Sequence, residues 1–531
     1  MAIVGGRAYT PQQIRDAENE AMTVCAIPES RLIATAASAV TAEICGRFPG
    51  AETKGLRAAV LVGRGNNGAD GWMTAAGLLR NGWSVDVIRT SEAGGSAGCS
   101  EAYETFLEEA EKPSGNSYSA ATLSDAVAWD SYDVIVDAVF GIGLNREVSG
   151  EVASAFSEIN AKHGRAYVVS VDVPSGIDAL TGAVLGAAVR ADCTVTFSAK
   201  KTGLVLYPGR DYAGTCVVAD AGIPARCFRE EGYAVLETAP ILPKRARDGH
   251  KGIFGKILII AGSATGPGAC ILAAKACYRS GAGIVKAVAP EVVLPELLRF
   301  APETVFCGRK RYVSRIAEEQ AGYDVRLIGP GLGTDAEASE LLASVLGGSD
   351  DTVTVFDADA LNLLAKLLSD GTPEQRIRQL AAMLPKQSIL TPHPAELSRL
   401  LGVTVGEVSA KRLDFAKLWI SLCDIVLVMK DACTIVAGDG KLVFNATGND
   451  GMGTAGSGDV LAGIASALAN FALRGTATPA ECAAFAVALH GTAGDIAASE
   501  IGRVSLTAGD IIRYLPRALG APSAIEKGTD D

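Results

Sequence analysis

The chain has 531 residues, of which 48% are hydrophobic and 20% are charged, so it is too long for one hydrophobic core and we expect two or more domains. Its formal net charge of −12 argues against general binding to nucleic acid or to anionic membranes, because both need a basic surface. Its 60 glycines exceed the average share of about 7%, which is typical of α/β proteins whose strand-to-helix loops bind ligands.

Cysteine and histidine usage limits the metal and redox chemistry. The 12 cysteines are scattered without a CxxC pair, and there are only four histidines. This pattern predicts neither a zinc site nor a disulfide framework, so we expect reduced thiols. The N-terminus lacks the regions of a signal peptide, and no apolar run is long enough to span a membrane. We therefore expect a soluble cytoplasmic protein.

Two helices are predicted at the start of the chain. Thr10 as N-cap and Pro11 at the first helical position open a helix that continues toward Met22. An Ala-rich helix follows over roughly residues 30–48. These helices precede the first predicted strand.

A strand over residues 58–62 leads into the glycine-rich loop 63–71, which a further helix follows. The unit is similar to a dinucleotide-binding loop but lacks the GxGxxG spacing. Asn66, Asn67 and Asp70 add side-chain oxygens that a plain pyrophosphate loop does not need. The loop is therefore a candidate ligand site.

Carboxylates follow the next buried strands. These strands are predicted within residues 84–88, 134–141 and 166–172. Because ligands bind beyond the carboxyl ends of parallel strands, we expect Asp70, Asp137 and Asp172 to converge on one crevice. Oxygen donors from Asn67, Asp137 and Ser175 suit a hard cation. The alternative is that these side chains only cap helices and stabilise turns.

Residues 194–209 predict a strand, two lysines and a return strand. Either Lys200 or Lys201 would pair with a phosphate or with a crevice carboxylate, and the alternative is a solvated turn lysine. Periodicity then fails over residues 225–249, where we predict a solvated linker. The expected domains are therefore residues 1–224 and 250–521, with a tail over residues 522–531.

The second half also alternates strands and helices, which predicts a mostly parallel sheet. Its strands are predicted within residues 256–261, 281–288, 325–333, 354–359 and 388–396. Two more strands within residues 425–436 flank a turn with Lys430 and Thr434, both suitable phosphate partners. His393 lies between two prolines at a strand end, where a structural role is the alternative to a ligand contact.

The most informative stretch is the small-residue loop 449–463, which runs into an apolar helix. Backbone N–H groups of such a loop, at the positive end of a helix, form an anion-binding site. The single carboxylate, Asp459, is placed to act as general base toward a hydroxyl that attacks a phosphoryl group. The alternative is a glycine turn with Asp459 as N-cap.

Both halves resemble known families. The N-terminal half resembles the NAD(P)HX epimerase family through residues 65–71, 136–143, 171–178 and 201–203. The C-terminal half resembles the ribokinase-like ADP- or ATP-dependent NAD(P)HX dehydratase family through residues 250–252, 261–263, 329–333, 357–361, 391–396 and 449–463. Fusion in this order is similar to the bifunctional nicotinamide-nucleotide hydrate repair enzymes of prokaryotes. The chain departs from the family at residues 33–37, where the usual glutamate is missing, and at Ala69, where a glycine is common.

The resemblance implies a Rossmann-like three-layer αβα domain followed by a ribokinase-like α/β domain. The substrate would be NADH or NADPH hydrated on its ring, which the first domain epimerises and the second dehydrates in the S form. The bifunctional architecture favours ADP over ATP as the cosubstrate of dehydration, together with magnesium, giving AMP and phosphate. We expect the chain to bind these small-molecule substrates, to bind neither nucleic acid nor membranes, and to form a homo-oligomer.

The resemblance also implies site residues in the epimerase half. The hydrate would be held by Asn66, Asn67, Gly68, Ala69, Asp70, Gly141, Ile142, Gly143, Leu144, Asn145, Arg146, Glu147 and Asp172. A potassium ion would be held by Asn67, Asp137 and Ser175. We also expect Lys201 to position the hydrate or to assist proton transfer beside Asp172.

In the dehydratase half the hydrate would contact Ala269, Gly333, His393 and the base Asp459. The adenine nucleotide would be held by Lys430, Asp431, Ala432, Cys433, Thr434 and Gly458.

Two other classes of protein function remain as alternatives. The C-terminal half would also fit an ordinary ribokinase-like small-molecule kinase, such as a hydroxymethyl kinase of a vitamin precursor, because the GSGD loop is shared across that superfamily. The N-terminal fold also occurs as a non-catalytic scaffold in RNA-decay proteins. Asn67, Asp137 and Asp172 with the acidic net charge argue against a scaffold, and the segments of His393 and Lys430 argue against a plain kinase.

Overall fold

The structure is a computed structural model that divides into two compact units, Arg7–Gly232 and the part that begins at Tyr233. It describes residues 6–48, 55–91, 95–112, 117–123, 127–161, 164–229, 232–239, 241–242, 247–346 and 352–520. The tail predicted over residues 522–531 lies outside this set.

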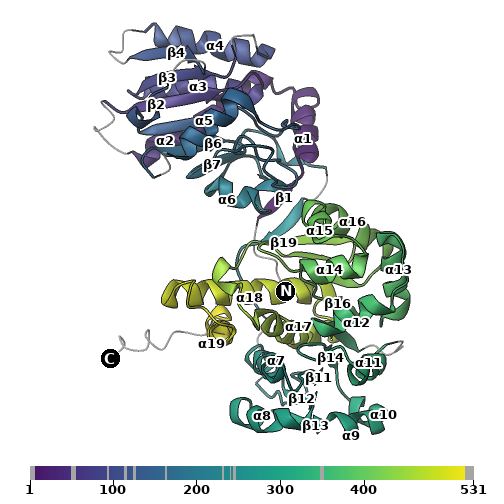
Figure 1. Cartoon of the computed structure of the whole chain (residues 1–531). Helices are drawn as coiled ribbons and strands as arrows, with labels where there is room; N and C mark the ends of the chain where they lie inside the picture. Colours follow the sequence, from purple (N-terminus) through teal and green to yellow (C-terminus); the bar gives the residue numbers. More distant parts are fainter. Residues whose placement is uncertain are drawn as a thin grey trace, which may run out of the picture. The chain divides into compact units, whose positions relative to one another are not determined.

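The N-terminal unit contains a seven-stranded sheet in the order β4–β3–β2–β5–β6–β7–β9, and every neighbouring pair is parallel (Figure 1). Its strands are β2 (Arg57–Val62), β3 (Ser84–Arg89), β4 (Tyr118–Thr122), β5 (Val134–Ala138), β6 (Tyr167–Val171), β7 (Cys193–Phe197) and β9 (Thr215–Ala219). The strand order reverses between β2 and β5. Such a switch point opens a crevice at the carboxyl ends of the strands.

Helices cover both faces of this sheet, which confirms the Rossmann-like three-layer prediction. One face packs on α2 (Glu29–Arg47), α3 (Asn66–Arg80) and α4 (Ala97–Ala110), and the other on α5 (Gly150–Asn160). Alternate residues of β2 show the division. Val60 belongs to the cluster with α2, α3 and α4, whereas Leu61 belongs to the cluster with Phe156 of α5.

The first helix, α1 (Pro11–Thr23), begins as predicted, because Thr10 and Gln13 form a capping box. Its buried Ala17 and Ala21 pack against Cys227 of the 3-10 helix η4 (Ala225–Cys227). The short strand β1 (Arg7–Tyr9) precedes it and pairs with β8 (Lys200–Lys201). This pairing fixes the backbone at the two lysines.

Three predictions of local structure were wrong. The helix after the glycine loop begins at Asn66, so residues 66–71 are helical. The return strand after Lys201 is absent, since residues 202–204 form the 3-10 helix η3 and α6 (Gly209–Ala213) follows. The predicted linker 225–249 contains β10 (Tyr233–Leu236), which pairs with β19 (Lys441–Asn445). Burial of Val235 and Leu236 explains why this segment is part of a sheet.

The C-terminal unit contains a sheet in the order β13–β12–β11–β14–β15–β16–β17–β18–β19–β10. Pairs from β13 to β17 are parallel, as predicted, and β18 is antiparallel to both neighbours. The remaining strands are β11 (Lys256–Ile260), β12 (Ile284–Ala289), β13 (Val305–Gly308), β14 (Val325–Ile328), β15 (Val353–Phe356), β16 (Ser388–Leu390), β17 (Val426–Met429) and β18 (Ile435–Gly438).

One face of this sheet shares a continuous core with α7 (Pro267–Arg279), α17 (Ser457–Leu473), α18 (Pro479–Ile501) and α19 (Ala508–Ala518). The other helices are α8 (Leu294–Phe300), α9 (Arg309–Ser314), α10 (Ile316–Gln320), α11 (Ala336–Ala343), α12 (Asp359–Leu367), α13 (Pro373–Met383), α14 (Pro394–Leu401), α15 (Val405–Ala410) and α16 (Arg412–Leu422). None of the helices in the described ranges is both long and apolar enough to cross a membrane.

Candidate functional site

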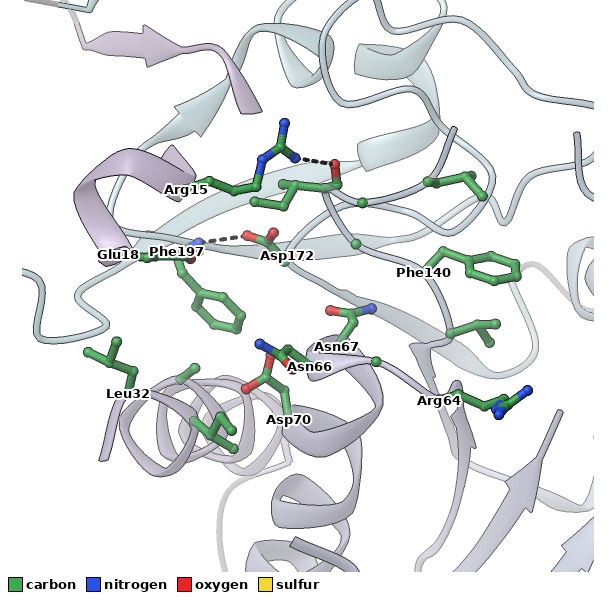
Figure 2. A pocket seen from close by; sticks show the side chains of 18 of the residues that line it. Arg15, Glu18, Leu32, Arg64, Asn66, Asn67, Asp70, Phe140, Asp172 and Phe197 are labelled. Carbon is green, nitrogen blue, oxygen red and sulfur yellow. Dashed lines mark hydrogen bonds between the residues drawn. The ribbon is translucent and has the colours of Figure 1, made fainter. Parts of the chain in front are cut away.

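The N-terminal unit has a cavity of about 760 Å³ at the carboxyl ends of its strands (Figure 2). It extends from Thr90 and Ser91, which follow β3, to Phe197 at the end of β7. Ten predicted substrate residues line it: Asn66, Asn67, Asp70, Gly141, Ile142, Gly143, Leu144, Asn145, Arg146 and Asp172. The structure therefore brings the loop after β2 and the loop after β5 to one site.

Three predicted substrate residues do not line this cavity. Ala69 of α3 is fully buried in the core between this helix and the sheet. Gly68 lies against the backbone of Gly63, where a Cβ atom would come within 2.1 Å of the Gly63 carbonyl oxygen. Glu147 is exposed to solvent. Gly68 and Ala69 are displaced because α3 starts at Asn66, which turns these residues toward the sheet.

Asp172 and Lys201 form an ion pair beside the cavity. Asp172 has a φ of 66°, a conformation that few non-glycine residues adopt, although aspartate does so more often than most. Its Oδ1 also accepts hydrogen bonds from the Phe197 N–H at 3.2 Å and the Thr196 hydroxyl at 3.3 Å. Lys201 is 1% exposed and donates to Thr196 Oγ1 and the Phe197 carbonyl, both at 3.0 Å. The pair is therefore rigidly held.

Glu18 of α1 is a cavity residue that the sequence did not reveal. Burial, and next the charge of Asp172, raise the pKa of Glu18 to about 7. Burial, followed by Asp172 and Glu18, also raises the pKa of Asp70 well above its usual value. Arg15, one turn before Glu18, donates to the Ile142 carbonyl at 3.2 Å and so ties α1 to the loop after β5. The cavity thus holds one carboxyl group, that of Glu18, with a pKa near neutrality, and a second, that of Asp70, with a raised pKa.

Of the three residues predicted to bind potassium, Asn67 lines the cavity, whereas Asp137 and Ser175 are buried, bond to each other and do not line it. Asp137 is fully buried and accepts from the Ser170 hydroxyl and the Ser175 N–H, each at 2.8 Å. Burial raises the pKa of Asp137, although hydrogen bonds from Ser175 oppose this. No lysine, arginine or histidine of the described ranges pairs with Asp137. Both polar side-chain atoms of Asn67 are also buried without a hydrogen-bond partner in the described structure.

In the C-terminal unit the small-residue loop ends at Gly456, the N-cap of α17, with a φ of 88°. Asp459 is the third residue of α17 and not its N-cap, so the capping alternative was wrong. Burial, and next the charge of Asp357, raise the pKa of Asp459 to about 7, while Lys430 opposes the shift. Within the described part of the chain the Asp459 carboxylate accepts no hydrogen bond. It is a candidate base.

Lys430, after β17, reaches the start of the same helix. Its Nζ lies 2.7 Å from Asp357 Oδ1 and 4.0 Å from Glu396 Oε2. A Cβ atom on Gly458 would lie 3.3 Å from this Nζ. Burial alone would lower the pKa of Lys430, but Asp357 and Glu396 outweigh it and raise the pKa. The ammonium group is therefore charged beside the anion-binding loop.

His393 caps α14: its Nδ1 accepts from the N–H groups of Ala395 at 3.1 Å and Glu396 at 3.3 Å. Burial, and next Lys430, lower the pKa of His393. The ring is therefore neutral at physiological pH. The structural role that was the alternative for His393 is therefore present, because its ring caps α14. The ring also lies close enough to Lys430 for its charge to lower the pKa.

Among the other predicted dehydratase residues, Gly333 lies in the loop after β14 and Ala269 lies in the first turn of α7. The Gly333 N–H donates to Asp359 Oδ2 at 2.8 Å, and a Cβ atom on Gly331 would lie 2.9 Å from Ala269 Cβ. In the predicted turn between β17 and β18, Asp431 and Ala432 are exposed, whereas Cys433 and Thr434 are buried.

A buried histidine on α18, His490, was not anticipated. Its Nε2 lies 3.3 Å from Ser457 Oγ at the first position of α17. Burial lowers the pKa of His490 to about 4, so the ring is neutral. The sequence carried no signal for this contact, because 33 residues separate the two side chains.

Comparisons with known proteins cover both units. The family model described as YjeF-related protein N-terminus matches residues 29–203, and that described as NAD(P)H-hydrate dehydratase matches residues 257–517. The bifunctional NAD(P)H-hydrate repair enzyme of Moorella thermoacetica is 36% identical over 93% of each chain, and that of Escherichia coli is 31% identical over 98% of this chain and 95% of its own.

Solved structures resemble the C-terminal part. One is an ADP/ATP-dependent NAD(P)H-hydrate dehydratase from Bacillus subtilis co-crystallised with ATP and Mg²⁺, with 29% identity and a TM-score of 0.45, covering 54% of this chain and 99% of that chain. The two family models and the near full-length relatives together identify the chain: it belongs to the family of bifunctional NAD(P)H-hydrate repair enzymes.

Proposed function

We propose that the chain repairs hydrated NADH and NADPH. The N-terminal unit interconverts the R and S epimers of the hydrate, and the C-terminal unit dehydrates the S epimer with ADP, giving NAD(P)H, AMP and phosphate. The observation that carries the proposal is that each unit of this family member holds a lysine among acidic side chains in its candidate site. Lys201 pairs with Asp172. Lys430 pairs with Asp357 near Asp459, whose pKa is raised to about 7.

Epimerisation inverts the ring carbon that carries both the hydroxyl group and the ring nitrogen. Reversible opening of either bond at this carbon needs one group that accepts a proton and one that donates a proton. Asp172 with Lys201 would supply one of these groups. Glu18 would supply the other, because its pKa of about 7 lets it act as acid or base near neutral pH.

Asn67, Asp137 and Ser175 would hold the potassium ion. The buried carboxylate without a cationic partner in the described structure, and the unpaired amide of Asn67, fit a bound monovalent cation. The ion would supply positive charge beneath the substrate. Exchange of K⁺ for a larger organic cation should then lower epimerisation without affecting dehydration.

For dehydration, Asp459 would take the proton of the ring hydroxyl as this oxygen attacks the terminal phosphoryl group of ADP. The N–H groups at the start of α17 and the Lys430 ammonium would stabilise the transferring phosphoryl group. The lone pair of the ring nitrogen then breaks the bond between the ring carbon and the phosphorylated oxygen, so that phosphate leaves. Loss of a proton from the neighbouring ring carbon gives NAD(P)H. Transfer thus converts hydroxide, a poor leaving group, into phosphate.

Magnesium would reach this site on the nucleotide. Among the described residues no cluster of three or more His, Cys, Asp or Glu side chains could hold a metal ion. This fits Mg²⁺, which binds phosphate oxygens and water with few protein ligands. We also expect the protein to be cytoplasmic and homo-oligomeric, and size-exclusion chromatography with light scattering tests the second expectation.

The test is to incubate the protein with the mixed epimers of hydrated NADH, with ADP, with ATP and without nucleotide. Recovery of the reduced-nicotinamide absorbance should require nucleotide, and it should consume both epimers. Recovery of only the S epimer would contradict the epimerase half. A stable phosphorylated product would instead favour a simple kinase.

A further inference from the structure

A second, smaller cavity of about 190 Å³ lies beside the large one in the N-terminal unit. The two share Arg64 and Ser91 in their walls. The Ser96 N–H donates to the Arg64 carbonyl at 2.9 Å and fixes the start of α4 next to the loop after β2. The small cavity therefore continues the large one at the β3 side of the sheet.

Arg89, the last residue of β3, lines the small cavity. Its side chain points to the same face as Val85 and Val87, which pack against α3 and α4. Its Nε is buried without a hydrogen-bond partner, and no ion pair to its guanidinium occurs among the residues that the structure describes. A buried arginine N–H without a partner is uncommon, because buried polar side-chain atoms normally have a hydrogen-bond partner.

The walls of the small cavity suit an anion. Arg64 and Arg89 bring two positive charges, and Ser91, Ser100 and Tyr103 bring hydroxyl groups. None of its described lining residues is an aspartate or glutamate. The carboxylates of the large cavity include Glu18 and Asp172, and Figure 2 shows Glu18 and Arg64 at opposite sides of the pocket.

The place of Arg89 in the topology indicates which anion it meets. In dinucleotide-binding sheets, the strand after the glycine loop and its helix ends near the adenosine ribose, where an acidic residue binds the 2′-hydroxyl and an arginine accommodates a 2′-phosphate. Here β2, the glycine loop, α3 and β3 follow in that order, and β3 ends in Arg89. With the reacting ring at Asp172, the adenosine end extends toward β3.

We propose that the small cavity is the subsite for the 2′-phosphate of hydrated NADPH, and that Arg89 makes the N-terminal unit favour this substrate over hydrated NADH. The inference rests on the proposed epimerase function, since it needs a dinucleotide in the large cavity. Arg89 is a specificity-determining residue, because it meets a part of the substrate remote from the reacting carbon.

The test compares epimerisation of hydrated NADPH and hydrated NADH without nucleotide, so that dehydration does not run, and resolves the epimers by NMR. The proteins are the full-length wild type, Arg89→Met, Arg89→Lys and the control Arg80→Met. Arg80 is an exposed arginine on α3, paired with Glu109 at 2.6 Å outside both cavities. It controls for loss of one positive charge from the same domain.

Wild type should have the higher kcat/KM for hydrated NADPH. Arg89→Met should lose roughly tenfold or more of this kcat/KM, mainly through KM, with hydrated NADH unchanged. Arg89→Lys should retain part of the preference, and Arg80→Met all of it. Retained turnover of hydrated NADH also shows that the variant folds.

Equal loss with both substrates would overturn the proposal, because Arg89 would then contact a shared part of the dinucleotide. An unchanged substrate ratio in Arg89→Met would overturn it as well. If wild type epimerises neither hydrate, the epimerase function fails, and calorimetry still tests the subsite: adenosine 2′,5′-bisphosphate should bind wild type more tightly than Arg89→Met, and equal affinities would refute it.

Discussion

The two units use a lysine and a carboxylate in opposite ways. In the N-terminal unit Lys201 bonds directly to Asp172, the residue that faces the cavity. In the C-terminal unit Lys430 bonds to a second acid, Asp357, and leaves the Asp459 carboxylate without a hydrogen bond in the described structure. Burial then raises the pKa of Asp459 to about 7.

This difference fits the two proposed reactions. A hydrate that is only epimerised brings no charge to its reacting carbon, so a charge-balanced Asp172–Lys201 pair suits it. Phosphoryl transfer brings several negative charges, for which a charged lysine beside a helix N-terminus is suitable. Asp459 must in turn accept a proton, and its raised pKa increases its strength as a base.

The substitution with the largest expected effect on one activity alone is Asp459→Asn. The change keeps the size of the side chain but removes the base, so ADP-dependent dehydration should fall roughly 10²- to 10⁴-fold. Epimerisation, measured without nucleotide, should stay at the wild-type rate. Near-normal dehydration by this variant would refute the role of Asp459, and loss of both activities would refute two independent sites.

In the N-terminal unit the matching variant is Lys201→Met. It leaves Asp172 without its cation while the apolar stem is kept, and we expect epimerisation to fall roughly 10²-fold or more with dehydration of the S epimer unchanged. Lys200→Met is the control, because Lys200 precedes Lys201 in β8 and does not pair with Asp172. If Lys200→Met loses more activity than Lys201→Met, the assignment is wrong.

Glu18→Gln should have a smaller effect that depends on pH. A carboxyl group with a pKa of about 7 is protonated below that pH and ionised above it, so the wild-type epimerisation rate should change slope near pH 7. The glutamine variant should be roughly tenfold slower or more and should lose this inflection. An identical pH profile in both proteins would show that Glu18 does not transfer a proton.

The smallest expected effect is on stability. Folding raises the pKa of Asp459 from 3.8 to about 7, so the folded state binds this proton more tightly than the unfolded chain, and stability falls as pH rises between these values. At pH 8, Asp459→Asn should therefore stabilise the C-terminal unit by up to about 4 kcal/mol. Thermal melts should differ at pH 8 and coincide near pH 4. A less stable variant at pH 8 would contradict the argument.

Periodicity predicted most of the strands and both sheets, because buried parallel strands are continuous apolar runs. It missed the start of α3, since Asn66 and Gly68 have low helix propensity and tertiary packing overrides it here. It also missed β10, which pairs with a strand about 200 residues later. The hydrophobic periodicity of the sequence gives little indication of a short strand whose pairing partner lies far away in the chain.

The residues of the candidate sites also differ in whether they could be predicted from the sequence. Asp172, Lys201, Lys430 and Asp459 follow strands or a glycine loop, so their place at strand ends could be predicted from sequence. Glu18 could not, because only the packing of α1 brings it to the cavity. Arg89 and His490 likewise depend on which helices cover the strands. Elements that meet only in tertiary structure set the environment of the predicted residues.

The strand β10 has a practical consequence for separating the two activities. A C-terminal fragment that begins at His250, where the sequence predicts the domain boundary, lacks β10 and exposes the backbone of β19 as an open edge. Open edges promote pairing between chains. Expression of the dehydratase half should therefore start at or before Tyr233, and a fragment that starts at His250 is expected to aggregate. During synthesis β10 leaves the ribosome before β19, so the two strands cannot pair fully until Asn445 has also left it.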